Sequence, residues 1–234
     1  MKQLAFAKIS YIDDEKEEFA GDLANKDTVS QFSYQLSELF AKRRSVKLFD
    51  RDFHMPDSHI KTIVRAASLA PSAFNIQHWR VVRIVSKDVK EQFYDIAWKQ
   101  PQIISASELL VVCMDLQAWT REPFAFCHAK TESERDKFIS MLNGIYSGNP
   151  RLQRDEALRS TGLFCMLLML KAESMGYQSC PMSGFNYQKA ATLLALAEGI
   201  EPCMVIAIGK ADKNEIVQER TRMDIDEFMV TDHF

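Results

Sequence analysis

The segment APSAFNIQHW, residues 70–79, lies between a predicted helix and a predicted strand, and the fold can be followed outward from it. Before it, an amphipathic helical pattern begins near Asp57 and stops at Pro71, which cannot continue a helix. After it, WRVVRIVS (residues 79–86) predicts a strand, because the run is rich in β-branched residues. The polar loop between the two elements has a composition typical of turns and of ligand-binding loops.

Helical and strand patterns continue on both sides of this loop, with no internal repeat. Strands are expected over residues 109–114, 177–182 and 203–209, and further helices over residues 28–42, 88–98, 132–146, 154–175 and 188–198. The centre of the longest helix, Gly162–Leu170, is apolar on every side, which predicts that it is buried all round. The chain is therefore expected to be an α+β protein with one sheet flanked by helices.

The bulk composition is that of an ordinary globular protein. Apolar residues make up 47% and charged residues 26% of the 234, and a formal charge of −3 gives no basic surface for nucleic acid. No segment has the roughly 18–20 apolar residues that a membrane span needs. The five cysteines are odd in number and scattered, and the N-terminus lacks the pattern of an export signal. We therefore expect a cytoplasmic protein with reduced thiols and with no nucleic-acid or membrane partner.

Residues 1–27 differ from the rest of the chain. Five acidic residues lie between Asp13 and Glu18, and the segment shows little periodicity. We expect an N-terminal extension, either packed on a surface such as that of a partner subunit or disordered. Residues 28–234 are expected to form a single domain.

Three segments and one C-terminal pair carry groups suited to a planar, phosphorylated ligand. Residues 42–47 (KRRSVK) offer guanidinium groups and a hydroxyl, and residues 71–77 (PSAFNIQ) offer hydroxyl and amide groups. Residues 180–185 (CPMSGF) end a strand in a glycine-containing turn that a ligand can approach closely, and Arg220 and Arg222 add two cations. Taken singly, each has an ordinary explanation as a basic helix end, turn chemistry or a connector.

The four together, in this order and spacing, resemble the nitroreductase family, whose members read RRSxR/K, then APSxxNxQPW, then PxxGF, then a basic pair after a strand that ends in glycine. Residues 206–210 (IAIGK) match that strand, and the resemblance spans roughly residues 36–228. It implies a mixed, mostly antiparallel sheet flanked by helices, in an intertwined homodimer that binds FMN at the interface. Such a dimer would also cover the remaining face of the apolar 162–170 helix.

The resemblance assigns the matching positions to three groups of FMN contacts. The phosphate and ribityl side is assigned to Arg43, Arg44, Ser45, Arg220 and Arg222. The ring or ribityl chain is assigned to Pro71, Ser72, Asn75 and Gln77, with Asn75 contributed by the second subunit. One flavin face, with backbone N–H groups near N5 and O4, is assigned to Pro181, Met182, Ser183 and Gly184. Lys47 is expected beside N1 and O2, where a fixed cation favours the reduced flavin.

Some positions depart from the family's usual residues. Ala73 stands where a second serine is frequent, and His78 stands where proline is common. Ser183 replaces a frequent glutamate and Asn186 a frequent aspartate. The role expected at Ser183 belongs to the backbone, so activity is still expected. Residues 117–150, which cover the substrate pocket in the family, have no recognisable match.

The resemblance implies an FMN-dependent oxidoreductase with a ping-pong cycle. NADH or NADPH would pass hydride to flavin N5, and a small electron-poor acceptor such as a nitroaromatic or quinone would then be reduced in the same cavity. No side chain is required as acid or base in the first half-reaction, and the histidines and cysteines show no metal-site pattern. Two alternatives stay open, namely a dehalogenating or flavin-degrading branch of the same family and a non-enzymatic flavin-binding module.

Overall fold

The computed structural model describes residues 26–121, 130–217 and 220–233, with side chains from residue 31 onward. The chain divides into a larger unit, Arg43–Glu215, and a smaller unit formed by the described residues before and after it. Residues 1–25, nearly all of the expected N-terminal extension, lie outside the described residues. The boundary expected at residues 27 and 28 stays a prediction.

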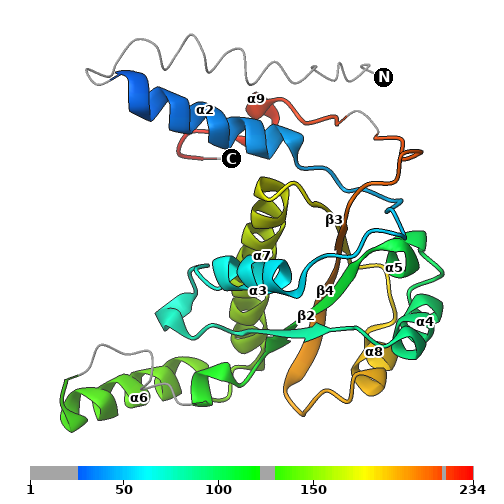
Figure 1. The fold of residues 1–234 in the computed structure, drawn as a ribbon. Coiled ribbons are helices and arrows are strands. Elements are labelled where there is room, and N and C mark those ends of the chain that lie inside the picture. Colours follow the sequence, from blue (N-terminus) through cyan, green and yellow to red (C-terminus); the bar gives the residue numbers. More distant parts are fainter. Residues whose placement is uncertain (1–25, 122–129, 218–219, 234) are drawn as a thin grey trace, which may run out of the picture. The chain divides into compact units, whose positions relative to one another are not determined.

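The larger unit is built on a four-stranded antiparallel sheet in the order β1-β2-β4-β3 (Figure 1). The strands are β1 (Trp79–Arg83), β2 (Glu108–Asp115), β3 (Gln178–Met182) and β4 (Ile200–Gly209). A parallel bridge between Ser45 and Ser179 adds an extended segment beyond β3. The predicted α+β class and the mixed, mostly antiparallel sheet are therefore confirmed.

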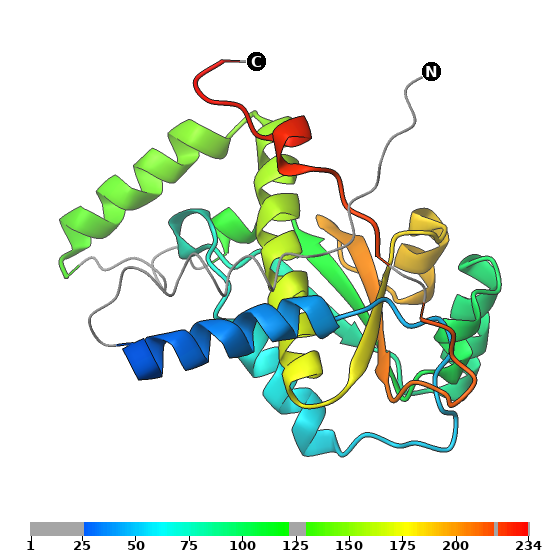
Figure 2. The same ribbon diagram turned by 90° about the horizontal axis from the view of Figure 1, so that it is seen from above.

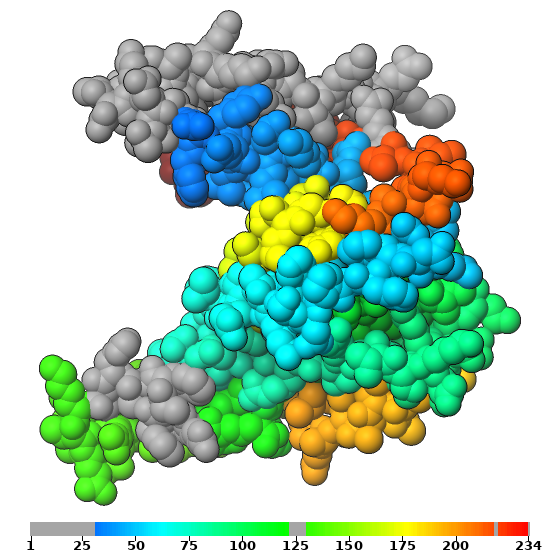
Figure 3. Space-filling model, in the orientation of Figure 1, coloured from blue at the N-terminus to red at the C-terminus, as the bar shows by residue number. Residues whose placement is uncertain are grey.

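Helices cover both faces of this sheet (Figure 2). One face carries α3 (Asp57–Ala67) and α7 (Pro150–Ser174), and the other carries α4 (Lys87–Ile96), α5 (Pro101–Ser105) and α8 (Tyr187–Leu193). A further helix, α6 (Glu132–Tyr146), lies at the end of the larger unit away from α4, as the space-filling view shows (Figure 3). Two short 3-10 turns, η1 (Ala73–Asn75) and η2 (Ala118–Thr120), complete the unit.

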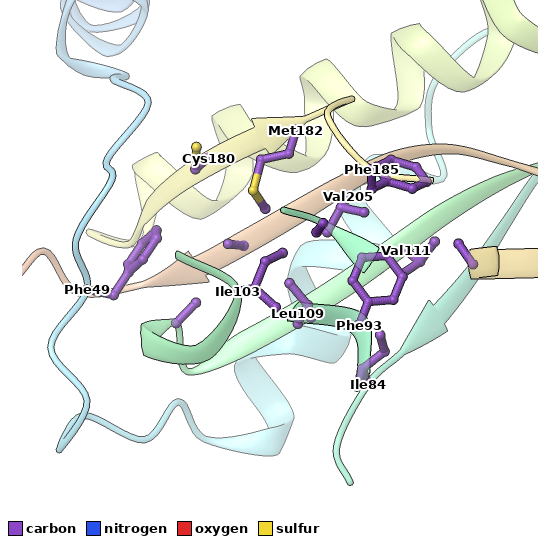
Figure 4. Packing of buried hydrophobic residues seen from close by; sticks show 14 of the residues in the cluster. Phe49, Ile84, Phe93, Ile103, Leu109, Val111, Cys180, Met182, Phe185 and Val205 are labelled. Atoms are coloured by element: carbon purple, nitrogen blue, oxygen red, sulfur yellow. The ribbon is translucent and has the colours of Figure 1, made fainter. Parts of the chain in front are cut away.

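The central strand β2 separates two apolar cores. All of its residues are buried, and its side chains alternate between the faces of the sheet as strand geometry requires. Leu109 and Val111 join a cluster with Phe93 and residues of α5 and β3 (Figure 4). Leu110 and Val112 join the cluster on the α3 and α7 side. A strand buried on both faces explains why its sequence is a continuous apolar run.

The prediction that Gly162–Leu170 is buried all round is wrong for the single chain. Phe164 and Leu168 are fully buried, whereas Leu163 is 48% exposed and Met166 is 39% exposed. A helix that packs on one face of a sheet buries one stripe, and no described segment of the larger unit covers the opposite stripe of α7.

The observed bounds of two helices differ from the predicted ones because of local backbone and capping interactions. The helix α7 begins at Pro150, four residues before the predicted Arg154, because the Asn149 side chain accepts the Leu152 N–H at 3.2 Å and proline suits the first turn. The helix α8 ends at Leu193, five residues before the predicted end, and Ala195 then takes a left-handed φ of 48°. The five-residue α5 was not predicted at all.

The smaller unit contains α2 (Lys26–Lys42) and α9 (Ile225–Phe228). The apolar face predicted for α2 is present, but Phe32, Leu36 and Phe40 are 70%, 41% and 42% exposed. Among the described residues, no helix is both long enough and apolar enough to cross a membrane.

Candidate functional site

The first candidate segment, residues 43–48, runs beside β3 as an extended chain. The Val46 N–H donates to the Ser179 carbonyl at 3.1 Å, and Ser45 bridges Ser179 in parallel. Because side chains alternate along extended backbone, Val46 is buried while the flanking Ser45 and Lys47 are exposed. The backbone pairing thus presents a hydroxyl and an ammonium group on one side of the segment.

Lys47 is fixed at both its backbone and its side chain. The Lys47 N–H and the Leu48 N–H donate to the two carboxylate oxygens of Glu215, at 2.7 and 2.8 Å. The Lys47 Nζ donates to the Cys180 Sγ at 3.4 Å. Burial raises the pKa of the Cys180 thiol, against the opposing influence of Lys47, so the sulfur is a neutral acceptor. The ammonium group therefore lies beside Cys180 of β3, the residue at which the third candidate segment begins.

That segment, Pro181–Gly184, turns out of β3 under two side chains that the sequence did not single out. The Gln100 Nε2 donates to the Gly184 carbonyl at 2.6 Å. A Cβ at Gly184 would lie 3.1 Å from the Trp98 ring and 3.3 Å from the Gln100 Nε2, so any other residue would require these side chains to shift by a few tenths of an ångström. Trp98 is 69% exposed and, like Lys99, has a left-handed φ. No local motif marks these residues, because only the tertiary fold brings them to the turn.

The second candidate segment, residues 71–78, has an unusual backbone. Phe74, Asn75 and Gln77 have φ values of 52°, 57° and 58°. The Ser72 Oγ accepts the Gln77 N–H at 2.9 Å, which closes the loop, and the side chain of Asn75 points to solvent. Left-handed conformations at residues other than glycine are costly and gather at functional sites. The loop therefore has a defined shape that exposes an amide group.

His78 follows this loop as a buried residue with no partner for its Nδ1 among the described residues. Burial lowers its pKa from 6.5 to about 4, with Glu156 and Asp115 opposing that shift and Arg80 adding to it. The imidazole is therefore neutral at pH 7. It is an uncharged group packed in the core.

Within one larger unit the candidate segments lie at opposite edges of the sheet. Residues 71–78 enter β1, whereas residues 43–48 and 181–184 flank β3. The strand order β1-β2-β4-β3 separates the two edge strands by three strand spacings, roughly 14 Å. The structure thus brings Ser45 and Lys47 close to Pro181, but it does not bring the Asn75 loop to them.

The two candidate arginines of the smaller unit have different surroundings. The Arg220 guanidinium donates to the carbonyls of Phe40 and Ala41, at 3.2 and 2.9 Å, and so caps the C-terminal end of α2. Arg222 is exposed and donates to the adjacent Thr221 carbonyl at 2.7 Å. Of the two, Arg222 has the side chain better placed for an external anion.

An aromatic cluster connects the 71–78 loop to α6. The Phe74 ring meets Phe138 and Tyr146 edge-on, with centroids 6.3 Å apart in both cases, and Trp119 stacks on Tyr146. The segment expected to cover a substrate is therefore packed against the loop that carries Asn75. No group of three or more potential metal ligands occurs within the described ranges.

Known proteins share the family motifs and the fold of this chain. The family model described as "Nitroreductase family" matches residues 40–210. Protein DrgA of Synechocystis sp. is 37% identical over 169 residues, which cover 72% of this chain and 80% of that protein.

Two solved structures have the same fold. One, described as an NAD(P)H:FMN oxidoreductase from Staphylococcus epidermidis, has a TM-score of 0.77 at 26% identity and covers 83% of this chain and 94% of its own. The other, described as a nitroreductase in complex with FMN from Exiguobacterium sibiricum, has a TM-score of 0.73 at 25% identity and covers 83% and 96%. With the family model spanning most of the chain, the protein belongs to the nitroreductase family.

Proposed function

We propose that the protein is an FMN-dependent oxidoreductase that oxidises NADH or NADPH and reduces a small electron-poor acceptor. The observation that carries the proposal is the position of Lys47: its ammonium group donates to Cys180 of β3, and its backbone is held by the carboxylate of Glu215. The exposed Ser45 hydroxyl lies on the same segment, and the Pro181–Gly184 turn follows directly. A cation, a hydroxyl and exposed backbone at one sheet edge fit a flavin with its phosphate tail.

The residues present fit FMN. The phosphate and ribityl groups would be bound by Arg43, Ser45 and Arg222. Arg220 lies close to Arg222 in the sequence, and its guanidinium is held by two carbonyls of α2. Lys47 would lie beside N1 and O2, and the backbone of Ser183 and Gly184 would face N5 and O4. This assignment is supported by the solved relative that binds FMN and by the order of the matching motifs.

We expect the protein to act as a homodimer, for two independent reasons. The loop with Ser72, Asn75 and Gln77 lies at the sheet edge remote from Lys47, so one chain alone cannot close both around a ring. The exposed stripe of α7, with Leu163 and Met166, also needs a cover, and a second copy would supply both. Asn75 would then contact the flavin bound mainly by the partner subunit.

When bound, FMN supplies two-electron transfer between a nicotinamide and an acceptor that occupy the same cavity in turn. Lys47 would stabilise the negative charge that reduction places on the pyrimidine edge of the ring. The amide of Asn75 and the turn at residues 181–184 would fix the orientation of the ring. The proposal gives no side chain a role in proton transfer.

The test is reconstitution of the purified protein with flavins. We expect a yellow dimer of twice 26.8 kDa that releases FMN and not FAD, and that is reduced by NADH or NADPH without added acceptor. Arg222→Ala should weaken FMN binding roughly tenfold to a hundredfold, because a charge-assisted contact to the phosphate is lost. A colourless protein that does not take up FMN would refute the proposal. Turnover of nitrofurazone compared with a halotyrosine would identify the class of acceptor.

A further inference from the structure

Asp115, the last residue of β2, is a fully buried carboxylate with three donors. Its Oδ2 accepts the Arg80 Nη2 at 2.9 Å and the Arg121 Nε at 2.8 Å. Its Oδ1 accepts the Gln117 N–H at 3.0 Å. A charge without solvent is kept in a core only when it is paired in this way, so these donors hold Asp115 in one position.

Arg80 connects this carboxylate to the loop that carries the candidate flavin contacts. Its Nη1 donates to the Gln77 carbonyl at 3.0 Å and to the Trp79 carbonyl at 2.9 Å. The Gln77 N–H is already held by the Ser72 Oγ, so the left-handed Gln77 is held at both of its backbone groups. Asp115 orients Arg80 and therefore determines the direction of the Gln77 carbonyl.

Arg121 and Gln117 connect the same carboxylate to the start of residues 117–150. Both residues flank the short η2 turn that leads toward α6. Fixing them fixes the turn from which this segment departs, next to the aromatic contact between Trp119 and Tyr146. One buried group thus holds two neighbouring parts of the chain.

We infer that Asp115 is a positioning residue for the flavin. Through Arg80 it sets the loop that presents Gln77 and Asn75 to the flavin. The inference rests on the proposed function, since it assumes that FMN contacts this loop. It predicts that loss of this carboxylate weakens cofactor binding and loosens the loop at Gln77 together.

The opposite end of β2 offers a matched control. Glu108 is also a buried carboxylate paired with an arginine, and its two oxygens accept from the Arg83 Nε at 2.6 Å and the Arg83 Nη2 at 2.8 Å. Arg83 also pairs with Asp57 at the start of α3. These contacts join β1, β2 and α3 and touch neither candidate loop. Glu108→Gln therefore perturbs stability by the same chemistry without reaching the site.

The test compares Asp115→Asn, Arg80→Lys and Glu108→Gln in the full chain. We expect Asp115→Asn and Arg80→Lys to weaken FMN binding about tenfold and to speed hydrogen exchange at the Gln77 amide at least tenfold in the apoprotein. Glu108→Gln should lower the Tm as Asp115→Asn does, yet leave the FMN Kd and the exchange at Gln77 within about twofold.

The outcomes separate the inference from the proposed function. If wild-type protein takes up no FMN, the proposed function fails. Hydrogen exchange at the Gln77 amide then still tests whether Asp115 stabilises the loop. If wild type binds FMN and Asp115→Asn binds it equally well, with unchanged exchange at Gln77, the inference is overturned. If Asp115→Asn does not fold, Arg80→Lys decides, because it keeps the charge beside Asp115 but loses the fork that reaches two carbonyls.

Discussion

The two polar segments that flank the sheet of the larger unit are held in different ways. Residues 43–48 are held from outside, by pairing of Val46 with Ser179 and by the carboxylate of Glu215. Residues 71–78 include three left-handed residues and are held partly from within, by the Ser72 hydroxyl that accepts the Gln77 N–H, and partly by Arg80, which donates to the Gln77 carbonyl.

The difference predicts how each segment responds to change. An extended segment with regular pairing stores little strain, so an exposed side chain such as Lys47 can be replaced without moving the backbone. A left-handed residue other than glycine costs about 1–2 kcal/mol, and the surrounding contacts must offset that cost. The 71–78 loop should therefore be sensitive to its buried neighbours, and the 43–48 segment to the carboxylate of Glu215.

The largest effect concerns the core beneath the 71–78 loop and depends on pH. The pKa of His78 is lowered from its ordinary value of 6.5 to about 4 in the folded state, so the unfolded chain binds a proton first as the pH falls. Stability from the neutral imidazole is fully present above pH 6.5 and is lost progressively as the pH falls through 4, by about 3 kcal/mol in all.

Urea unfolding at a series of pH values measures this loss. His78→Leu removes the titrating group, and since the Nδ1 has no described partner, the variant should fold and show a flatter profile between pH 6.5 and 4. An unchanged slope in His78→Leu would assign the pH dependence to other groups. Asp57, whose pKa is lowered to about 2 chiefly by its hydrogen bonds to Lys61 and Arg83, contributes only below that window.

The second effect tests the external support of the 43–48 segment. Glu215→Ala leaves the N–H groups of Lys47 and Leu48 without their acceptor and should cost about 1–3 kcal/mol of unfolding free energy. Glu215→Gln keeps one carbonyl oxygen and should cost less. Equal stability of wild type and Glu215→Ala in urea unfolding would mean that the pairing of Val46 with Ser179 is sufficient support.

The sequence predicted the parts of the fold that local chemistry determines. The helix α6 has the predicted bounds, because Thr131 and Glu134 form a capping box at its start. The fully buried β2 was also evident from its apolar run. Burial of α7 was overestimated, because an apolar stretch does not indicate which of its faces packs within the same chain. Leu163 and Met166 stay exposed.

The candidate site was predictable only in part, for a similar reason. The motifs gave Ser45, Lys47 and the 181–184 turn, which the structure brings together at β3. They did not give Cys180 as the acceptor of Lys47, nor Glu215 as its backbone partner, 168 residues away in the chain. Contacts of such high sequence separation depend on strand order, which no local pattern encodes.

The third effect isolates the charge of Lys47. Lys47→Met keeps most of the side-chain length but removes the cation proposed beside N1 and O2, so it should lower the two-electron midpoint potential of bound FMN by about 30 mV, or about 1.4 kcal/mol. Oxidised FMN should bind almost as well as in wild type. Lys87→Met, at a residue with an 87% exposed side chain on α4, is the control and should leave the potential unchanged. An equal change of the FMN midpoint potential in both variants would mean that Lys47 does not lie beside the ring.

The smallest effect compares two substitutions at one left-handed residue of the 71–78 loop. Asn75 has a φ of 57° and an exposed side chain. Asn75→Gly relieves backbone strain, which should raise the unfolding free energy by about 0.5 kcal/mol, whereas Asn75→Ala should lower it by about 1 kcal/mol because a Cβ disfavours this conformation. Both variants lose the amide and should bind FMN several-fold more weakly. Stability and cofactor affinity would then move in opposite directions in Asn75→Gly, as expected where backbone strain is kept for binding. If Asn75→Gly were less stable than Asn75→Ala, the loop would not carry the strain that distinguishes it from residues 43–48.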